Sequence, residues 1–178
     1  PSAVFEWSKM LEKTNGIKSC IEFGSNIGIN MKALQILFPK MDLSAVEINK
    51  SACDEYLSKF LKKENIFNQS ILEFEPKKKY DLAFTKGVLI HINPDELENV
   101  YQKLYEASNK YVLICEYYNP APVSIDYRGN SEKLFKRDFA GGFMDKFKDI
   151  ELIDYGFFYR RDNNYNFDDE TWFLMKKA

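Results

Sequence analysis

Two acidic residues and the glycine-containing turn between them have the types and spacing needed to bind a small ligand. Glu22 lies at the end of a short apolar run, and Gly24 and Gly28 follow it in the segment that leads to a helix. Glycine lets the backbone turn tightly near a ligand, and the start of a helix offers unpaired N–H groups to an electronegative group. Glu47 follows Gly24 by roughly 20 positions, where nucleotide-binding sheets place an acid that accepts hydrogen bonds from ribose hydroxyls. A ligand with a ribose and an ammonium group, such as S-adenosylmethionine (SAM), would fit these two acids.

The same turn departs from the glycine pattern of dinucleotide-binding sites. The fingerprint G-x-G-x-x-G is absent, because Asn26 stands where its second glycine would lie. That glycine lets a pyrophosphate come close to the backbone, so the turn disfavours an oxidoreductase with a nucleotide cofactor. Two simpler interpretations stay open: Gly24 and Gly28 could open a helix without a ligand, and Glu22 could be a buried acid that caps a neighbouring loop.

The elements that must position these residues alternate along the chain. Compact apolar runs predict strands, and apolar residues at helical spacing predict helices between them. The predicted strands are residues 19–23, 43–48, 80–85 and 111–116, and the predicted helices are residues 5–13, 30–38, 51–62 and 93–107. Alternating strands and helices indicate a parallel sheet with helices on both faces, and ligands bind at the carboxyl ends of the strands of such a sheet.

The alternation ends after residue 119. Residues 119–146 are polar and rich in aromatic residues, prolines and glycines, and we expect them to form a substrate-recognition insertion with a short helix at residues 131–135. Two strand-like segments follow, at residues 150–159 and 171–175, with no helix between them. Consecutive strands without a crossover helix predict an antiparallel pair at the edge of the sheet.

The composition restricts the classes of protein to which the chain can belong. With 178 residues, 45% of them hydrophobic and 29% charged, residues 1–178 are expected to form a single globular domain rather than a disordered chain. A formal net charge of -2 excludes the cationic field needed for non-specific binding to duplex nucleic acid. The three cysteines are far apart, predict neither a disulfide framework nor a zinc site, and favour a reducing cytoplasm. No apolar run is long enough to span a membrane.

The single histidine is a candidate general base. His91 follows the predicted strand at residues 80–85, and active-site loops gather at such strand ends in open parallel sheets. A histidine that hydrogen-bonds to the backbone near Asn93, the cap of the next helix, is an equally good interpretation. Both interpretations stay open.

Several segments of the sequence resemble a known family. The runs IEFGSNIGIN, AVEIN and YDLAFTKGVLIHINPDEL look like the SAM-binding motifs of class I methyltransferases. Three further runs, ICEYYNPAPVSIDYRG, LFKRDFAGGF and DYGFFYRRDNNYNFDDETWFLMKK, resemble the pseudaminic acid biosynthesis-associated methylase family. The SAM-binding motifs are shared by many methyltransferases, whereas the pieces YRG and LFKRDFAG are much more specific to that family. The resemblance covers the chain from Gly16 onward.

This resemblance implies a fold and a set of cofactor-binding residues. The fold is α/β and Rossmann-like, with a central, mostly parallel seven-stranded sheet, an antiparallel C-terminal strand and helices on both faces. The residues that would hold SAM are Glu22, Gly24, Ser25, Asn26, Gly28, Glu47, Ile48, Ser70, Ile71, Thr85, Lys86 and Gly87. Among them, Glu47 would hold the ribose, and Ser70 and Ile71 would flank the adenine. Ser70 departs from the aspartate that is common there in other class I enzymes.

Cations and aromatic residues in the insertion are the candidates for recognition of a methyl acceptor. A planar guanidinium can grip a carboxylate or a phosphate with two hydrogen bonds, although scattered charges on a loop are usually only solvated. With the resemblance, the predicted substrate-binding residues are Tyr118, Asn119, Tyr127, Arg128, Lys136 and Arg137, and the predicted catalytic residues are His91 and Tyr117.

The predicted function is SAM-dependent methyl transfer to a nonulosonic acid, such as pseudaminic acid, or to an activated or conjugated form of it. Transfer from a sulfonium is an in-line displacement that needs an aligned acceptor and, for a hydroxyl, a base, but no metal. The expected partner is therefore a small anionic sugar, with neither nucleic acid nor membrane. Oxygen and nitrogen acceptors, and free, nucleotide-linked or protein-linked sugars, stay open. A non-catalytic SAM-binding protein with a regulatory or scaffold role is the alternative.

Overall fold

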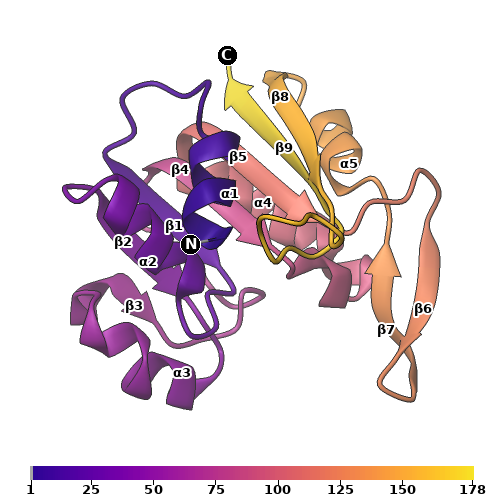
Figure 1. Cartoon of the computed structure of the whole chain (residues 1–178), viewed down its shortest axis with the longest axis horizontal. Helices are drawn as coiled ribbons and strands as arrows, with labels where there is room; N and C mark the ends of the chain where they lie inside the picture. Colours follow the sequence, from indigo (N-terminus) through magenta and orange to yellow (C-terminus); the bar gives the residue numbers. More distant parts are fainter. Residues whose placement is uncertain (1) are drawn as a thin grey trace.

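A seven-stranded sheet forms the centre of this computed structural model, which describes residues 2–178 apart from the side chains of residues 127 and 130–133 (Figure 1). The strands lie side by side in the order β3, β2, β1, β4, β5, β9, β8. Their bounds are β1 (Ser19–Phe23), β2 (Asp42–Val46), β3 (Ile66–Phe67), β4 (Tyr80–Lys86), β5 (Ser108–Glu116), β8 (Ile150–Phe158) and β9 (Glu170–Lys177).

Most neighbours in this sheet are parallel. β1 pairs in parallel with β2 and β4, and the parallel pairing extends to β3 on one side and to β5 on the other. β9 is antiparallel to both of its neighbours, β5 and β8. The predicted sheet, mostly parallel with an antiparallel C-terminal strand, is confirmed, and so is the antiparallel pair at its edge.

Helices cover both faces of the sheet (Figure 1). The α-helices are α1 (Ser2–Met10), α2 (Ile29–Leu37), α3 (Lys50–Glu55), α4 (Leu97–Ala107) and α5 (Phe139–Lys146), and the single turns of 3-10 helix are η1 (Leu57–Lys59), η2 (Lys63–Asn65), η3 (Leu89–His91) and η4 (Pro94–Glu96). Trp7 of α1 and Leu34 of α2 pack with Phe84 on one face, and Leu104 of α4 packs with Ile114 on the other. Among the described residues, no helix has the length and apolar character needed to cross a bilayer.

One helix is shorter than its apolar spacing predicted. The helix expected at residues 51–62 ends at Glu55 and is followed by the separate turn η1. The chain turns here because Leu57 and Phe60 pack against Gly28, where a Cβ atom would lie only 2.7 and 2.6 Å from their side chains. Packing against the turn after β1 thus overrides the helical pattern.

The insertion contains a hairpin where the sequence predicted a short helix. Residues 131–135 lie in β7 (Asn130–Lys136), which pairs antiparallel with β6 (Val123–Tyr127) in a separate two-stranded sheet. Arg128 and Gly129 connect the two strands with positive φ angles of 50° and 78°, which suits a two-residue hairpin turn. The helix prediction was wrong because this turn sends the chain back as a paired strand.

The helix of the insertion begins only after the hairpin. Asp138 starts α5, since its side chain accepts a hydrogen bond from the backbone N–H of Gly141 at 2.8 Å. Leu134 of β7 and Phe143 of α5 are buried in the same core cluster, and β7 also packs against η3. The hairpin is therefore anchored at its base, while its strands stand out from the body of the molecule (Figure 1).

Candidate functional site

The turn after β1 has the backbone that its glycines predicted. Gly24 and Gly28 have positive φ angles of 84° and 80°, and Asn26 between them has a φ of 48°. A Cβ atom on Gly24 would lie 2.7 Å from a methyl carbon of Val88, so the position needs glycine for space as well as for its backbone angle. Gly24 therefore brings the turn close to the segment that follows β4.

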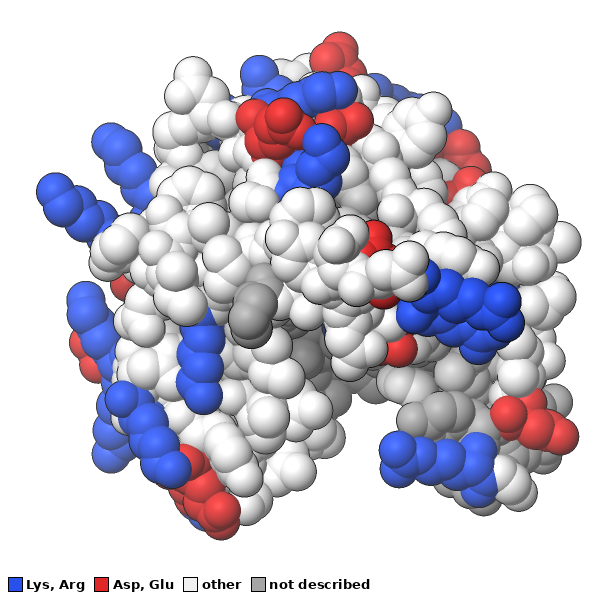
Figure 2. Space-filling model, in the orientation of Figure 1, with Lys and Arg blue, Asp and Glu red and all other residues white. Residues whose placement is uncertain are grey.

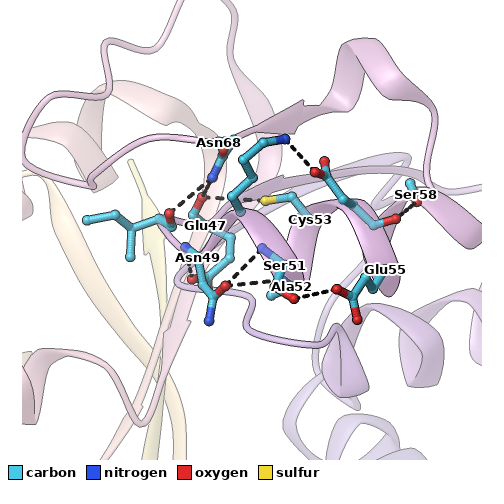
Figure 3. Close-up of polar contacts among 11 residues, drawn as sticks. Glu47, Asn49, Ser51, Ala52, Cys53, Glu55, Ser58 and Asn68 are labelled. Carbon is cyan, nitrogen blue, oxygen red and sulfur yellow. Dashed lines mark hydrogen bonds and ion pairs between the residues drawn. The ribbon is translucent and has the colours of Figure 1, made fainter.

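Glu47 follows β2, and its carboxylate ties two backbone segments together. Oε2 accepts a hydrogen bond from the backbone N–H of Asn26 at 2.6 Å, and Oε1 accepts one from the backbone N–H of Asn49 at 2.8 Å. Asn68 donates to the carbonyl oxygen of Glu47 at 2.9 Å, and Asn49 caps α3 by accepting from the backbone N–H of Ser51 at 2.9 Å (Figure 3). A carboxylate can accept more than these two hydrogen bonds, so Glu47 is fixed in orientation and can still accept from ligand hydroxyls.

Glu22, near the end of β1, is buried and has one carboxylate oxygen without a partner. Oε1 accepts a hydrogen bond from the side chain of Asn30 at 2.6 Å, and Oε2 has no hydrogen-bond partner among the described residues. Burial raises the pKa of Glu22 to about 7, although the hydrogen bond from Asn30 opposes this shift. A buried carboxylate oxygen without a donor suits a cationic ligand group, such as the ammonium of SAM.

Two cavities share Gly24 as a lining residue and lie near the carboxyl ends of the parallel strands. The first has a volume of about 300 Å³ and an apolar wall that includes Ile48, Ile71 and Ile92. The second has a volume of about 330 Å³ and is polar; its polar lining includes Glu6, Asn26, Asn30, Lys86, Asp168 and Glu170. Together they offer an apolar compartment and a charged compartment on the two sides of one glycine.

Most of the predicted cofactor residues line these cavities. Those in the first cavity are Gly24, Glu47, Ile48, Ser70, Ile71 and Gly87, and those in the second are Gly24, Ser25, Asn26 and Lys86. Glu22 and Thr85 lie beneath the cavity walls, with exposed fractions of 1% and 0%. Gly28 instead packs against the segment after α3. The structure thus brings most of the predicted set together around the turn.

Sequence reasoning missed the wall formed by α1 and the residues at the start of β9. Glu6 of α1, Asp168 and Glu170 line the second cavity, where Lys86 forms ion pairs with Glu170 and, at 3.7 Å, with Glu6. Burial lowers the pKa of Lys86, but Cys115 and the two carboxylates raise it above its ordinary value. The Lys86 charge is therefore already paired within the chain. The acidic turn before β9 is a sequence signal for Asp168 and Glu170, whereas no sequence pattern pointed to Glu6.

Glu116, the last residue of β5, is a further site residue that sequence reasoning missed. Its Oε1 accepts hydrogen bonds from the backbone N–H groups of Val88 and Leu89 at 3.1 and 3.0 Å, and its Oε2 has no partner among the described residues. Burial raises the pKa of Glu116 to about 7, against the opposing effect of these two hydrogen bonds. Glu116 thus holds the start of η3, which lines the first cavity through His91 and packs against β7. Its signal, an acid that ends an apolar strand, is the one that identified Glu22.

The two predicted catalytic residues lie in different surroundings. His91 ends η3 and lines the first cavity beside Ile92. Tyr117 follows β5, and the Nζ atom of Lys136 lies 5.3 Å from the centre of its ring. Tyr118 is 42% exposed. The structure therefore brings His91 to the apolar cavity and Tyr117 to the base of the hairpin.

The predicted acceptor-binding residues lie on the hairpin and on the segments next to it. Arg128 is exposed at the hairpin turn, and Arg137 is half-buried, with an Nε atom that has no acceptor among the described residues. The side chain of Asn119 donates to the carbonyl oxygen of Ala121 at 2.6 Å. The side chain of Tyr127 lies outside the described residues. Figure 2 shows Lys and Arg side chains on the hairpin and above it, next to the hollow that separates the hairpin from the body.

A larger cavity lies away from these residues. It has a volume of about 470 Å³ and is lined by residues around β3, including Glu64, Phe67 and Tyr80, and by none of the predicted site residues. Within the part of the chain that the structure describes, no group of three or more His, Cys, Asp or Glu residues could hold a metal ion. The predicted site residues therefore lie apart from this larger cavity.

Comparison with known proteins gives matches in structure but not in sequence. No protein-family model matches the chain, and a search of curated proteins found no match. An S-adenosylmethionine-dependent methyltransferase from Clostridium acetobutylicum has a TM-score of 0.72 and 14% identity, over 99% of this chain and 91% of that chain. The O-methyltransferase of a trans-AT PKS multienzyme of Brevibacillus brevis, in complex with S-adenosyl-L-homocysteine (SAH), has a TM-score of 0.75 and 13% identity, over 97% of this chain and 71% of that chain.

A third neighbour contains both a methyl acceptor and the demethylated cofactor. The 1,6-didemethyltoxoflavin-N1-methyltransferase of Burkholderia thailandensis, with bound 1,6-didemethyltoxoflavin and SAH, has a TM-score of 0.75 and 11% identity, over 99% of this chain and 79% of that chain. Identities this low establish likeness of fold. With the strand order and the antiparallel β9 already described, these matches show that the chain has the Rossmann-like fold of class I SAM-dependent methyltransferases.

Proposed function

We propose that the chain is a SAM-dependent methyltransferase. The single observation that carries this proposal is the pair of cavities that share Gly24, with the buried acid Glu22 beneath the turn and Glu47 at the wall. An apolar compartment suits an adenine, and a polar compartment suits an amino acid group. Glu47 suits a ribose, because it lines the apolar cavity and accepts a hydrogen bond from Asn26, which lines the polar one. SAM has these three parts in that order.

The chain's own residues bind and orient the cofactor in this proposal. Glu47 accepts from the ribose hydroxyls, while Ile48 and Ile71 pack against the adenine and Ser70 lies beside it. Glu22 and the backbone N–H groups of the turn hold the amino acid end, and Thr85 to Gly87 lie at the transfer site. When bound, SAM supplies a methyl group on a positively charged sulfur, which is already a good leaving group. The protein then contributes mainly alignment of the acceptor.

The proposed acceptor is an anionic sugar of the nonulosonic acid type, such as pseudaminic acid, in free, activated or conjugated form. The motif resemblance supports this, and so do Arg128, Lys136 and Arg137, cations close to the hairpin that follows β5. Tyr118, Asn119 and Tyr127 are the further proposed contacts. The Burkholderia thailandensis neighbour binds the small molecule 1,6-didemethyltoxoflavin, which supports a small-molecule acceptor here as well. For a hydroxyl acceptor, we propose His91 or Tyr117 as the group that takes the proton.

Calorimetric titration of SAM, SAH and NAD into the purified chain tests the cofactor proposal. We expect SAM and SAH to bind and NAD not to bind. Transfer of a labelled methyl group from SAM to a panel of nonulosonic acid derivatives, with neutral hexoses as controls, then tests the acceptor. NAD binding in place of SAM would favour an oxidoreductase. SAM binding without transfer to any member of the panel would reject the proposed acceptor and favour a regulatory or scaffold role.

A further inference from the structure

A chain of hydrogen bonds connects α1 to the buried acid of the proposed cofactor site. The indole N–H of Trp7 donates to Oδ1 of Asn30 at 3.1 Å, and Nδ2 of Asn30 donates to Oε1 of Glu22 at 2.6 Å. Trp7 is fully buried, and its ring meets the ring of Phe84 edge-on with 4.5 Å between their centres. The first donor in the chain is therefore fixed by core packing.

These two contacts allow Asn30 a single orientation. With its amide reversed, the NH₂ group would face the indole N–H of Trp7 and the carbonyl oxygen would face the Glu22 carboxylate, so both hydrogen bonds would be lost. In the observed orientation, one oxygen of Glu22 is engaged and Oε2 stays without a partner among the described residues. The sequence thus needs an amide at this position, since an acid would place a second carboxylate against Glu22.

The residues around this chain also form the wall of the polar cavity. Asn30 lines that cavity, and so does Glu6, the neighbour of Trp7 in α1. We propose that Trp7 and Asn30 are positioning residues for the cofactor site: they hold Glu22 by one oxygen and keep the other available to the ammonium group of SAM or SAH. This inference rests on the proposed function. It makes the docking of α1 a requirement for tight cofactor binding, in addition to its part in the core.

The groups that face Glu22 define the pH range over which this arrangement works. They are Cys20 of β1, Glu47 after β2 and Lys86 of β4, and Lys86 is itself paired with Glu6 of α1. Burial raises the pKa of Glu22 to about 7 and Glu47 adds to this, whereas Asn30, Ser25 and Lys86 oppose it. The carboxylate is the form that attracts an ammonium group. We therefore expect SAH affinity to rise as the pH increases through about 7 and to level off above that value.

The pH profile of SAH affinity, measured by calorimetry from about pH 6 to about pH 9, tests the role of Asn30. Asn30→Asp keeps the shape of the side chain and an acceptor for Trp7, but it replaces the donor to Glu22 with a second carboxylate. The pKa of Glu22 then rises further, so the midpoint of the profile moves to higher pH. At neutral pH we expect an affinity loss of about tenfold or more.

Trp7→Phe tests the first link of the chain with a smaller change. It keeps an aromatic ring in the core but removes the N–H that orients Asn30, together with part of the ring volume. We expect SAH to bind about twofold to tenfold more weakly, with a pH midpoint shifted upward. Trp172→Phe is the matched control, because Trp172 is 3% exposed, belongs to the same core cluster and has no hydrogen bond to Asn30. It should change the unfolding temperature without moving the midpoint.

An exchange of the two groups separates positioning from stability. The double variant Glu22→Gln, Asn30→Asp restores one donor and one acceptor in reversed positions. We expect its unfolding temperature to recover relative to Asn30→Asp alone. Its SAH affinity should stay low at every pH, because position 22 no longer carries the negative charge. A purely structural role would predict that both quantities recover together.

The outcomes distinguish this inference from the proposed function. Failure of the wild-type chain to bind SAH would overturn the proposed function, and this inference with it. A wild-type chain that binds SAH, together with an unchanged affinity and pH midpoint in Trp7→Phe and Asn30→Asp, would overturn the inference alone. If Asn30→Asp does not fold, Trp7→Phe compared with Trp172→Phe decides the matter.

Discussion

The cofactor side and the hairpin side of the site differ in how their polar side chains are held. On the cofactor side, both carboxylate oxygens of Glu47 accept backbone N–H groups, and Asn30 fixes Glu22. On the hairpin side, Nε of Arg137 has no acceptor among the described residues, and Arg128 is exposed at a turn. Side chains that the chain itself orients are prepared for one ligand shape. A guanidinium with an unused donor suits a ligand that brings its own acceptor.

The difference follows from where each side lies in the fold. The acids of the cofactor side lie at the ends of adjacent parallel strands, β1 and β2, whose register the whole sheet fixes. The hairpin forms a sheet of its own, β6 and β7, and meets the body through contacts such as those of β7 with η3. Cofactor binding should therefore fail steeply when the backbone of the turn is changed, and acceptor binding should fail gradually.

The largest effect is expected from Gly24→Val. The substitution adds a β-branched side chain where φ is 84° and where a Cβ atom would lie 2.7 Å from Val88, so the turn must change its path. Calorimetry should detect no SAH binding, while circular dichroism still shows a folded protein. Gly24→Ala with Val88→Ala relieves the steric contact but not the backbone strain, and should bind SAH weakly. Normal SAH titration of Gly24→Val would show that this turn does not bind the cofactor.

Glu116→Gln tests the residue that joins the two sides through η3. Glu116 has a pKa of about 7 in the folded chain against 4.5 ordinarily, so the folded protein keeps a proton that the unfolded chain releases. Its contribution to the free energy of unfolding is complete below about pH 4.5 and disappears as the pH rises through about 7. In Glu116→Gln, the free energy of unfolding should therefore fall less between about pH 4.5 and about pH 7 than in the wild type, by up to about 3 kcal/mol.

Urea unfolding at a series of pH values measures this effect. Glu55→Gln provides the matched control, since it makes the same substitution at an exposed position. The pKa of Glu22 is also raised to about 7, so part of the pH dependence of the free energy of unfolding should remain in Glu116→Gln. A profile for Glu116→Gln that coincides with the wild type would contradict the assignment of this proton to Glu116.

Glu47→Ala should have an intermediate effect on cofactor affinity. It removes the proposed acceptor of the ribose hydroxyls and frees the backbone N–H groups of Asn26 and Asn49. Hydrogen bonds to a charged group contribute about 1.5–3 kcal/mol, so SAH should bind about tenfold to a hundredfold more weakly. In Glu55→Ala, which changes an exposed acid on α3, the affinity should match the wild type. Equal affinities in both variants would remove Glu47 from the cofactor site.

The smallest effect is expected from Arg137→Lys and Arg128→Lys on the hairpin side. Lysine keeps the charge but loses the two-pronged contact with a carboxylate or phosphate, so the KM for an anionic acceptor should rise about tenfold. SAH affinity should stay at the wild-type value. Unchanged turnover would assign these arginines to the solvated surface. Loss of SAH binding would instead place these arginines in a lid over the cofactor, and the cofactor side and the hairpin side would then no longer bind their ligands separately.

The acids of the cofactor side could be predicted because their signal is local. Glu22 and Glu47 each stand at the end of a short apolar strand, and the alternation of strands and helices predicts a parallel sheet whose carboxyl strand ends share one edge. Glu116 carries the same signal, since it ends the apolar strand β5. Glu6 and Glu170 could not be found this way, because only the docking of α1 and the return of β9 bring them to Lys86.

The hairpin could not be predicted because its strongest determinants are unusual or distant. Arg128 occupies a left-handed backbone position that glycine or asparagine ordinarily fills, so the turn lacks its common sequence pattern. Leu134 gains its burial from the core beneath η3, which is far from it in the sequence. The sequence therefore predicted a short helix at residues 131–135.

The position of η3 implies an energetic link between the two ligands. η3 is a single short turn that Glu116 holds by a hydrogen bond. Its residue His91 forms part of the wall of the first cavity, and the turn also packs against β7. If the cofactor and the acceptor favour the same arrangement of that turn, each increases the affinity of the other by the same factor, because the coupling free energy is reciprocal. Binding would then be cooperative, with the acceptor retained best while the cofactor is present.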